Sequence, residues 1–213
     1  VVIWSTLMEG YIENEHNEEA LECYEHMQLA LIPPNSITFV SSLKACGSIG
    51  AIKKGQEIHA NIERQGLLEG DIIIGNTLVD MYGKNGMLEE AHGAFDEILH
   101  KDSISYGTLI SGYVLHEQAY TALELFQKMK DKYLLPDKVT LIRILKACSS
   151  VGAVRQGQLV HEDIIKIGLE TDVMVGNALL NMYANCMTAE ETHKVLDSML
   201  ERDIFSWSSV ISA

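Results

Sequence analysis

Histidine, cysteine and glutamate are the side chains of this sequence that could support metal-dependent chemistry. His16, Asn17 and Glu18 form an H-x-E triplet, which zinc-dependent deaminases follow with a P-C-x-x-C motif. The chain has four cysteines, and none of them forms a C-x-x-C pair. His59 and His161 lack further ligands at the sequence spacing that metal sites commonly use. The sequence therefore predicts no metal ion, no cofactor and no catalytic residue, and we do not expect an enzyme.

The same two histidines occupy equivalent places in a stretch that the chain contains twice. Residues 43–59 read LKACGSIGAIKKGQEIH and residues 145–161 read LKACSSVGAVRQGQLVH, with ten of 17 positions identical. Further pairs of similar segments begin at Thr6 and Thr108, and at Gly75 and Gly176. The chain is thus an internal duplication with a period of about 102 residues. Cys46 and Cys148 are the same residue of this repeat, which favours buried thiols in a reducing compartment.

Each long period contains three similar pieces, and each piece has the pattern of a helical hairpin. An apolar segment such as IIIGNTLVDMY comes first, and an acidic amphipathic segment such as LEEAHGAFDEIL follows. The breaks between them, such as GSIG, GKNG and SSVG, suit left-handed turn conformations. Because a lone hairpin cannot bury its apolar faces, neighbours must stack. The sequence predicts an all-α solenoid of stacked helix-turn-helix units.

The repeat boundaries divide a single array into six complete units and the start of a seventh. The units are 1–35, 36–71, 72–102, 103–137, 138–172 and 173–203, and residues 204–213 begin the seventh. Because the chain starts at Val1 and stops in SVISA, we expect it to be a piece of a longer protein.

Composition limits the class of protein and raises a question about charge. Hydrophobic residues make up 47% of the chain, which excludes a disordered protein and permits a large core. No apolar run reaches the length of about 18 residues that a membrane span requires, so no membrane association is expected. The formal net charge of −14 is unusual for a nucleic-acid-binding protein, which normally carries a basic footprint.

The first unit, VVIWSTLMEGYIENEHNEEALECYEHMQLALIPPN, resembles a pentatricopeptide repeat (PPR). The residues that match the family pattern are Thr6, Leu7, Gly10, Ala20, Leu21, Tyr24, Met27 and Pro34. Over the whole chain, the alternation of 35-, 35/36- and 31-residue units resembles the P, L and S units of the plant PLS subclass. The tetratricopeptide repeat is the alternative, but Ser-Thr-Leu-Met follows Trp4 without the Gly of its W-x₂-L-G-x₂-Y pattern. The resemblance implies a right-handed superhelix of stacked hairpins.

The resemblance also implies binding of single-stranded RNA, with about one base read per unit. In the family, the fifth and the last residue of a unit contact the base edge. Transferred to this chain, the base-reading pairs are Ser5 with Asn35, Asn76 with Asp102, Gly107 with Asp137, and Asn177 with Asp203. The L-like units place Val40 and Ile142 at the fifth position, where neither can form a hydrogen bond, and we expect them to be poor readers. The expected RNA register is A-n-U-(G)-n-U/C from 5′ to 3′.

Two further positions of each unit carry an expected contact with RNA. The second residue packs against the base face in the family, and here it is Val2, Ile37, Ile73, Ile104, Val139, Met174 or Phe205. The alternative is that these apolar residues belong to the core. The family commonly places Lys at position 13 for a phosphate contact, and only Lys84 does so here. Glu13, Ser48, Leu115, Ser150 and Asn185 occupy the equivalent positions, so we expect weak binding.

The distribution of charge partly answers the question raised by the net charge. The first 13 residues of the complete units contain five basic and three acidic side chains, giving +5 − 3 = +2. Because the whole chain has a net charge of −14, the remaining residues together carry −16. Because first helices line the RNA groove in the family, the resemblance implies that the acidic residues face outward.

The resemblance implies a biological role as well. We expect the RNA-targeting module of a mitochondrial or chloroplast RNA editing or processing factor. The alternative is a protein-interaction scaffold that binds an editing cofactor protein or another partner through its L-like units. Exposed apolar ends of a stack of hairpins would also permit end-to-end self-association.

Overall fold

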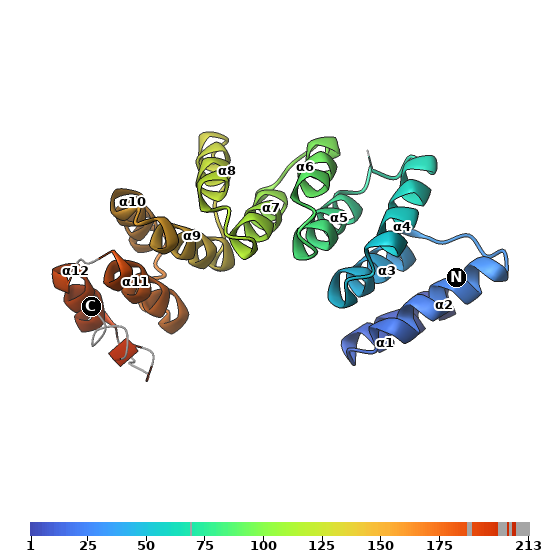
Figure 1. Ribbon diagram of the computed structural model, residues 1–213, viewed down its shortest axis with the longest axis horizontal. Coiled ribbons are helices and arrows are strands. Elements are labelled where there is room, and N and C mark those ends of the chain that lie inside the picture. Colours follow the sequence, from blue (N-terminus) through green and yellow to red (C-terminus); the bar gives the residue numbers. More distant parts are fainter. Residues whose placement is uncertain (69, 187–188, 200–203, 205, 208–213) are drawn as a thin grey trace. The chain divides into compact units, whose positions relative to one another are not determined.

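The computed structural model of this chain describes residues 1–68, 70–186, 189–199, 204, 206 and 207. Within these residues the chain forms twelve α-helices and no strand (Figure 1). The expected all-α fold is confirmed. None of the helices in this part of the chain has both the length and the apolar character needed to cross a membrane.

The helices alternate between the first and the second member of a hairpin. The first members are α1 (Val2–Glu13), α3 (Ser36–Ile49), α5 (Ile72–Lys84), α7 (Ser103–Leu115), α9 (Lys138–Val151) and α11 (Val173–Asn185). The second members are α2 (Asn17–Leu29), α4 (Ile52–Arg64), α6 (Leu88–Glu97), α8 (Ala119–Asp131), α10 (Val154–Lys166) and α12 (Ala189–Ser198). From α3 to α11, each first helix begins at the first residue of an expected unit. The division into P, L and S units stays a prediction.

Glycines make the turns between the two helices of several hairpins. Gly50 ends α3 with φ 71°, Gly152 ends α9 with φ 65°, and Gly86 follows α5 with φ 75°. A residue with a Cβ is strained in this left-handed region, whereas glycine is not. The turn function predicted for GSIG, GKNG and SSVG is confirmed.

The chain divides into two compact parts, Val1–Gly112 and Tyr113–Ala213. In the first part, α1 packs on α2 and α3, α3 packs on α4 and α5, and α5 packs on α6. In the second part, α8 packs on α9, α9 packs on α10 and α11, and α11 packs on α12. A first helix therefore contacts both its own hairpin partner and the next first helix, which is the packing of a solenoid.

The apolar residues of facing helices form the core of each part. Met8, Tyr24, Phe39, Leu43 and Ile58 are buried in the first part. The buried residues of the second part include Phe126, Met129, Leu141, Ile144 and Val160. This burial is the main term that stabilises the stack, because no hairpin covers its own apolar face.

Three of the four cysteines belong to this core. Cys23, Cys46 and Cys148 are buried and free, and Cys186 is half-buried. Burial raises the pKa of the Cys46 and Cys148 thiols to about 12. A thiol with so high a pKa is a poor nucleophile and a poor metal ligand at neutral pH. The repeated cysteine is therefore a packing residue.

A pair of glycines marks a close approach between α5 and α7 and supports a stability prediction. A Cβ on Gly112 would lie 3.1 Å from the Cα of Gly83. We expect Gly112→Ala to lower the free energy of unfolding by about 1–2 kcal/mol, because overpacking outweighs the gain in helix propensity.

Gly10 provides the control, since it occupies the same position of its unit and a Cβ there would meet no atom within 4 Å. Gly10→Ala should therefore raise stability by up to about 1 kcal/mol. Thermal unfolding followed by circular dichroism measures both variants, and effects of the same sign would contradict this interpretation.

Candidate nucleic-acid interface

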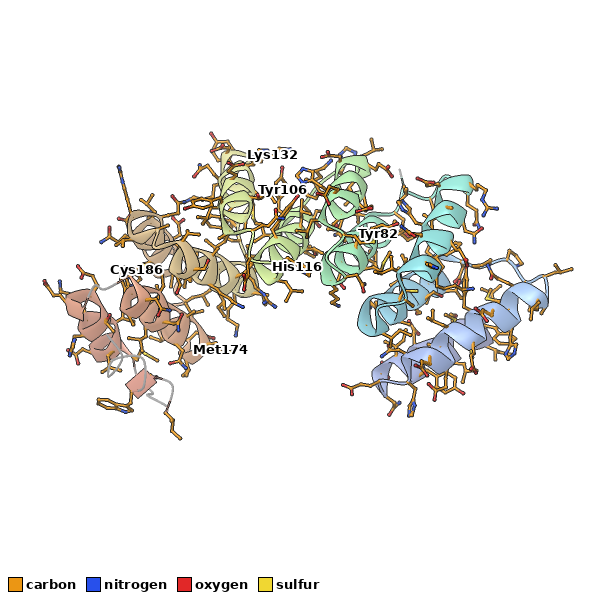
Figure 2. The ribbon with its side chains drawn as sticks, in the orientation of Figure 1. Tyr82, Tyr106, His116, Lys132, Met174 and Cys186 are labelled. Carbon is orange, nitrogen blue, oxygen red and sulfur yellow. The ribbon has the colours of Figure 1, made fainter. Side chains whose placement is uncertain are left out.

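Each first helix exposes an apolar side chain near its start. These are the residues at the second position of the six complete units. Their exposed fractions are 76% for Val2, 47% for Ile37, 62% for Ile73, 61% for Ile104, 54% for Val139 and 62% for Met174. Figure 2 shows Met174 on the surface at the start of α11. Phe205 lies outside the described residues.

These exposures exclude the interpretation of the second residues as core. From the second unit on, the residue that follows each of them is buried instead, as Thr38, Ile74 and Val175 illustrate. The helix therefore turns its second residue to solvent and its third residue to the neighbouring hairpin. Exposed apolar side chains that recur once per unit are suited to contact the flat face of a nucleobase.

The polar residues at the fifth position lie partly below this surface. The side chain of Ser5 is buried, and its Oγ donates a hydrogen bond of 2.9 Å to the carbonyl oxygen of Val2. Asn76 is half-buried, and its Oδ1 is buried without a hydrogen-bond partner in the described structure. Asn177 is also half-buried, and its Oδ1 accepts a hydrogen bond of 2.7 Å from Ser206 Oγ. In both asparagines the amide oxygen is turned inward. Gly107 is buried and has no side chain to offer.

In the first five units, the last residue is the N-cap of the next first helix. Asn35 Oδ1 accepts from the backbone N–H of Thr38 at 2.9 Å, and Asp137 Oδ1 accepts from that of Thr140 at 2.8 Å. Asp102 Oδ1 accepts from the N–H of Ser105 at 2.8 Å. Such caps satisfy a helix N–H that has no partner within the helix. Asp203 lies outside the described residues.

The N-cap function was missed by sequence reasoning, which assigned these residues only to base contacts. A signal for it exists, because Asn or Asp directly before an apolar helical segment is typical of an N-cap. The two functions are compatible, since a side-chain amide or carboxylate has a second polar atom that the cap does not use.

The L-like unit that ends at Asp172 is an exception. Asp172 Oδ1 accepts from the N–H groups of Met174 and Val175, and its Oδ2 lies 3.1 Å from Lys138 Nζ. Burial raises the pKa of Asp172, but the N–H of Val175 and the ammonium of Lys138 outweigh it and lower that pKa overall. Both oxygens of this carboxylate are therefore engaged, which agrees with the weak reading expected of a unit with Ile142 at its fifth position.

The single lysine at position 13 is also paired within the protein. Lys84 Nζ lies 2.7 Å from Asp80 Oδ2, one turn earlier on α5. The pair is exposed and adds little to stability, but Asp80 offsets the charge that Lys84 would offer to a phosphate. Glu13, Ser48 and Ser150 are exposed at the equivalent positions. The described first helices thus offer few cations for a nucleic-acid backbone.

The repeated histidines join neighbouring units. His59 Nδ1 lies 3.0 Å from the hydroxyl of Tyr82, and His161 Nδ1 lies 3.0 Å from the hydroxyl of Tyr183. Each ring also meets its tyrosine edge-on, with centroids 5.6 and 5.7 Å apart. Burial lowers the pKa of His161, so the neutral ring is favoured there. The two histidines therefore link α4 to α5 and α10 to α11.

Two glutamates near His59 were not identified by sequence reasoning. Glu63 lies one turn further along α4 and Glu97 ends α6, and the ligand atoms of the three residues lie within 4.8 Å of one another. The spacing of four residues between His59 and Glu63 was the available signal. Both carboxylates are exposed, and exposed acidic groups commonly gather near a histidine without binding an ion. This cluster alone does not define a metal centre.

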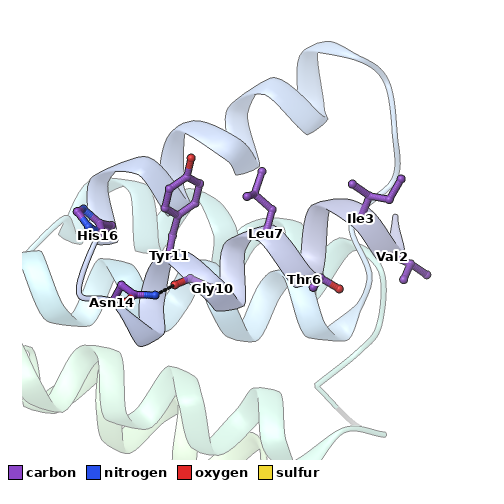
Figure 3. Close-up of a pocket in the computed structure, with 8 residues that line it drawn as sticks. All are labelled: Val2, Ile3, Thr6, Leu7, Gly10, Tyr11, Asn14 and His16. Atoms are coloured by element: carbon purple, nitrogen blue, oxygen red, sulfur yellow. Dashed lines mark hydrogen bonds between the residues drawn. The ribbon is translucent and has the colours of Figure 1, made fainter.

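A groove of about 770 Å³ runs along α1, and Figure 3 shows the side chains that line it. The lining residues are Val2, Ile3, Thr6, Leu7, Gly10, Tyr11, Asn14 and His16. Ile3 and Leu7 are exposed, whereas the equivalent Ile74 and Leu78 of α5 are fully buried by the neighbouring hairpin. The groove is therefore a packing face of the stack that no described hairpin covers. End-to-end self-association through such a face stays a prediction.

Comparison with known proteins places the chain in a family. The profile of the PPR repeat family matches residues 1–48, and that of the PPR repeat matches residues 76–103 and 104–134. A chloroplastic pentatricopeptide repeat-containing protein of Arabidopsis thaliana is 35% identical over 210 residues, which are 99% of this chain and 39% of that protein. A mitochondrial one from the same plant is 32% identical over 212 residues, which are 100% of this chain and 38% of that protein. The chain thus spans well under half the length of these relatives.

Solved structures show the same fold. The pentatricopeptide repeat protein PPR10 from maize matches with a TM-score of 0.70 at 19% identity, over 98% of this chain and 31% of that one. PPR10 in complex with an 18-nt psaJ RNA element matches with a TM-score of 0.81 at 22% identity, over 98% of this chain and 32% of that one. With the repeated hairpins and the profile matches, these likenesses show that the chain belongs to the pentatricopeptide repeat family.

Proposed function

We propose that this chain binds single-stranded RNA along its first helices, with about one base for each reading unit. The observation that carries the proposal is that the apolar residue at the second position is exposed in all six complete units. In the four reading units, the fifth and the last residue are polar or small and leave room for a base edge. A base held between two such residues exchanges water for apolar contact on both faces. The complex of PPR10 with RNA supports this function for the same fold.

The proposed register follows the pairs of fifth and last residues. Ser5 with Asn35 reads adenine, and Asn76 with Asp102 and Asn177 with Asp203 read uridine and tolerate cytidine. Gly107 with Asp137 favours guanine weakly, because Gly107 contributes no side chain. The two L-like units are silent, so the proposed target is A-n-U-(G)-n-U/C.

The cellular role that we propose is RNA targeting in an organelle. Relatives are chloroplastic or mitochondrial proteins, which favours an organellar transcript as the ligand. The alternation of unit lengths supports membership of the PLS subclass and hence a function in RNA editing or processing.

A protein-interaction scaffold is the second candidate, and the L-like units favour it. Val40 and Ile142 offer no hydrogen bond to a base, and Lys138 occupies the second oxygen of Asp172. Such units extend the array but do not select a base. A protein such as an editing cofactor could therefore contact them while the other units bind RNA.

Fluorescence anisotropy with two labelled RNAs tests the proposal. One RNA contains A-N-U-G-N-U, the other has the same composition in scrambled order, and both are titrated at low and near-physiological salt. We expect the designed RNA to bind more tightly by about tenfold or more, because each well-paired base adds roughly 1 kcal/mol or more. The preference should persist when salt weakens both complexes. Equal affinities would contradict base reading and favour the scaffold.

A further inference from the structure

From the second unit on, the third residue of each unit is fully or almost fully buried. These residues are Thr38, Ile74, Ser105, Thr140, Val175 and Ser206, and none is more than 2% exposed. Four of them carry a hydroxyl group, which must find hydrogen-bond partners in this position. The third residue of a unit therefore lies where it can act on polar groups of the unit before it.

The end of the second long period shows one such action directly. Ser206 Oγ donates a hydrogen bond of 2.7 Å to Oδ1 of Asn177, the fifth residue of the preceding unit. This hydrogen bond fixes which side of the Asn177 amide group carries the oxygen, and the two N–H donors lie on the opposite side of that group.

The equivalent pair in the first long period is Asn76 and Ser105, 101 residues earlier in both cases. Here Ser105 Oγ donates to Oδ1 of Asp102 at 3.0 Å, and Asn76 Oδ1 is buried without a partner in the described structure. A hydroxyl can change its partner by rotation about one side-chain bond. In one copy the serine donates to the fifth residue of the preceding unit, and in the other copy it donates to the last residue of that unit.

The third residue carries a hydroxyl group after each of the four reading units and lacks one after the two L-like units. Thr38, Ser105, Thr140 and Ser206 follow units with Ser5, Asn76, Gly107 and Asn177. The aliphatic Ile74 and Val175 follow the units with Val40 and Ile142. A hydroxyl is present where the preceding unit reads a base and absent where it does not, so burial alone does not account for it.

We propose that Ser105 and Ser206 are positioning residues that set base selectivity by holding the side-chain amide of Asn76 and Asn177, respectively. The inference rests on the RNA-binding function proposed above. An amide held with its oxygen inward offers N–H donors to the acceptors of a pyrimidine edge. Without the serine hydroxyl, the amide can turn over and offer its oxygen to the amino group of a purine. Selectivity then falls although the reading residues are unchanged.

The test uses the 213-residue chain and RNAs that differ only at the third or the sixth nucleotide of the target. We expect Ser105→Ala to reduce the preference for uridine over purines at the third nucleotide by about three- to tenfold, the effect of one hydrogen bond. The preference at the sixth nucleotide should be unchanged. Ser206→Ala should show the reverse pattern.

Ser105→Thr is the conservative control, because threonine already fills the equivalent buried place at Thr38 and Thr140. It should keep the wild-type preference. A second control combines Ser105→Ala with Asn76→Ala, in which the serine substitution should cause no further loss of selectivity. If Ser105→Ala only removed a helix cap, it would instead lower the thermal stability and reduce the affinity for all RNAs equally.

Two results would overturn the inference. The first is an unchanged preference at the third nucleotide in Ser105→Ala. The second is an equal loss of preference at the third and the sixth nucleotide in that variant. A wild-type chain that does not distinguish the RNAs at all would instead overturn the proposed function, and the positioning role with it. The wild-type titration therefore separates the two failures.

Discussion

The Asn76→Ser variant should lose its preference for uridine at the third nucleotide by about tenfold or more, and it should gain affinity for guanine there. The amide of Asn76 reaches further than a serine hydroxyl and carries two N–H donors. Shortening it leaves the uridine edge unpaired in a partly buried site, which costs roughly 1–3 kcal/mol, where 1.4 kcal/mol is a factor of ten. Competition between four RNAs that differ only at this nucleotide measures the change.

The repeat provides two controls for this variant. Asn177→Ser should produce the same change at the sixth nucleotide and none at the third. Ile142→Val, at the fifth position of a silent unit, removes no hydrogen-bonding group and should leave every preference unchanged. If Asn76→Ser weakened all four RNAs by the same factor, Asn76 would be a structural residue and the proposed register would be wrong.

Adding lysines at position 13 should strengthen RNA binding by about ten- to hundredfold at low salt, because phosphate contacts dominate affinity. The variant combines Glu13→Lys, Ser48→Lys and Ser150→Lys, three exposed residues of α1, α3 and α9. Each phosphate contact with a single strand adds roughly 0.7 to the magnitude of the slope of log K against log salt concentration. Three new contacts should therefore make the slope steeper by about 2. Anisotropy titrations at several salt concentrations give both quantities.

A matched variant separates the place of the charge from its amount. Glu89→Lys, Gln127→Lys and Gln158→Lys change the net charge equally but lie exposed on α6, α8 and α10. Charges on these second helices act on RNA only through solvent, where screening is strong beyond about 10 Å at 0.1 M salt. We expect a much smaller gain and an almost unchanged salt slope. Equal gains from the two variants would contradict RNA binding along the first helices.

The hairpins could be predicted from sequence because their signals are local. Apolar residues at helical spacing and glycines such as Gly50 and Gly86 act within a few residues, and the repeat shows each signal twice. Stacking followed from the apolar faces that a hairpin leaves uncovered. The exposure of Ile73 and Met174 was harder to predict from the sequence, because an apolar residue in a first helix fits both a core and a base-binding surface. The exposed fractions of Ile73 and Met174 in the folded structure decide between them, and the burial of the neighbouring third residues agrees.

The contacts around the reading residues could not be predicted in the same way. Lys138 and Asp172 pair across 34 residues, and Ser206 reaches Asn177 across 29 residues. Such partners depend on how one hairpin sits on the next, which no local pattern records. The pairing of Lys84 with Asp80 is different, because a spacing of four residues on a helix is visible in the sequence.

Photo-crosslinking identifies the residues that lie beside each nucleotide of the bound RNA. An RNA of the sequence A-N-U-G-N-U with 4-thiouridine at the third nucleotide is bound, irradiated, and mapped by mass spectrometry. We expect crosslinks in peptides that contain Ile73, Asn76 or Ile104, and a shift to peptides with Met174 or Asn177 when the label moves to the sixth nucleotide. Crosslinks confined to the second helices, or unchanged when the label moves, would contradict RNA binding in this register.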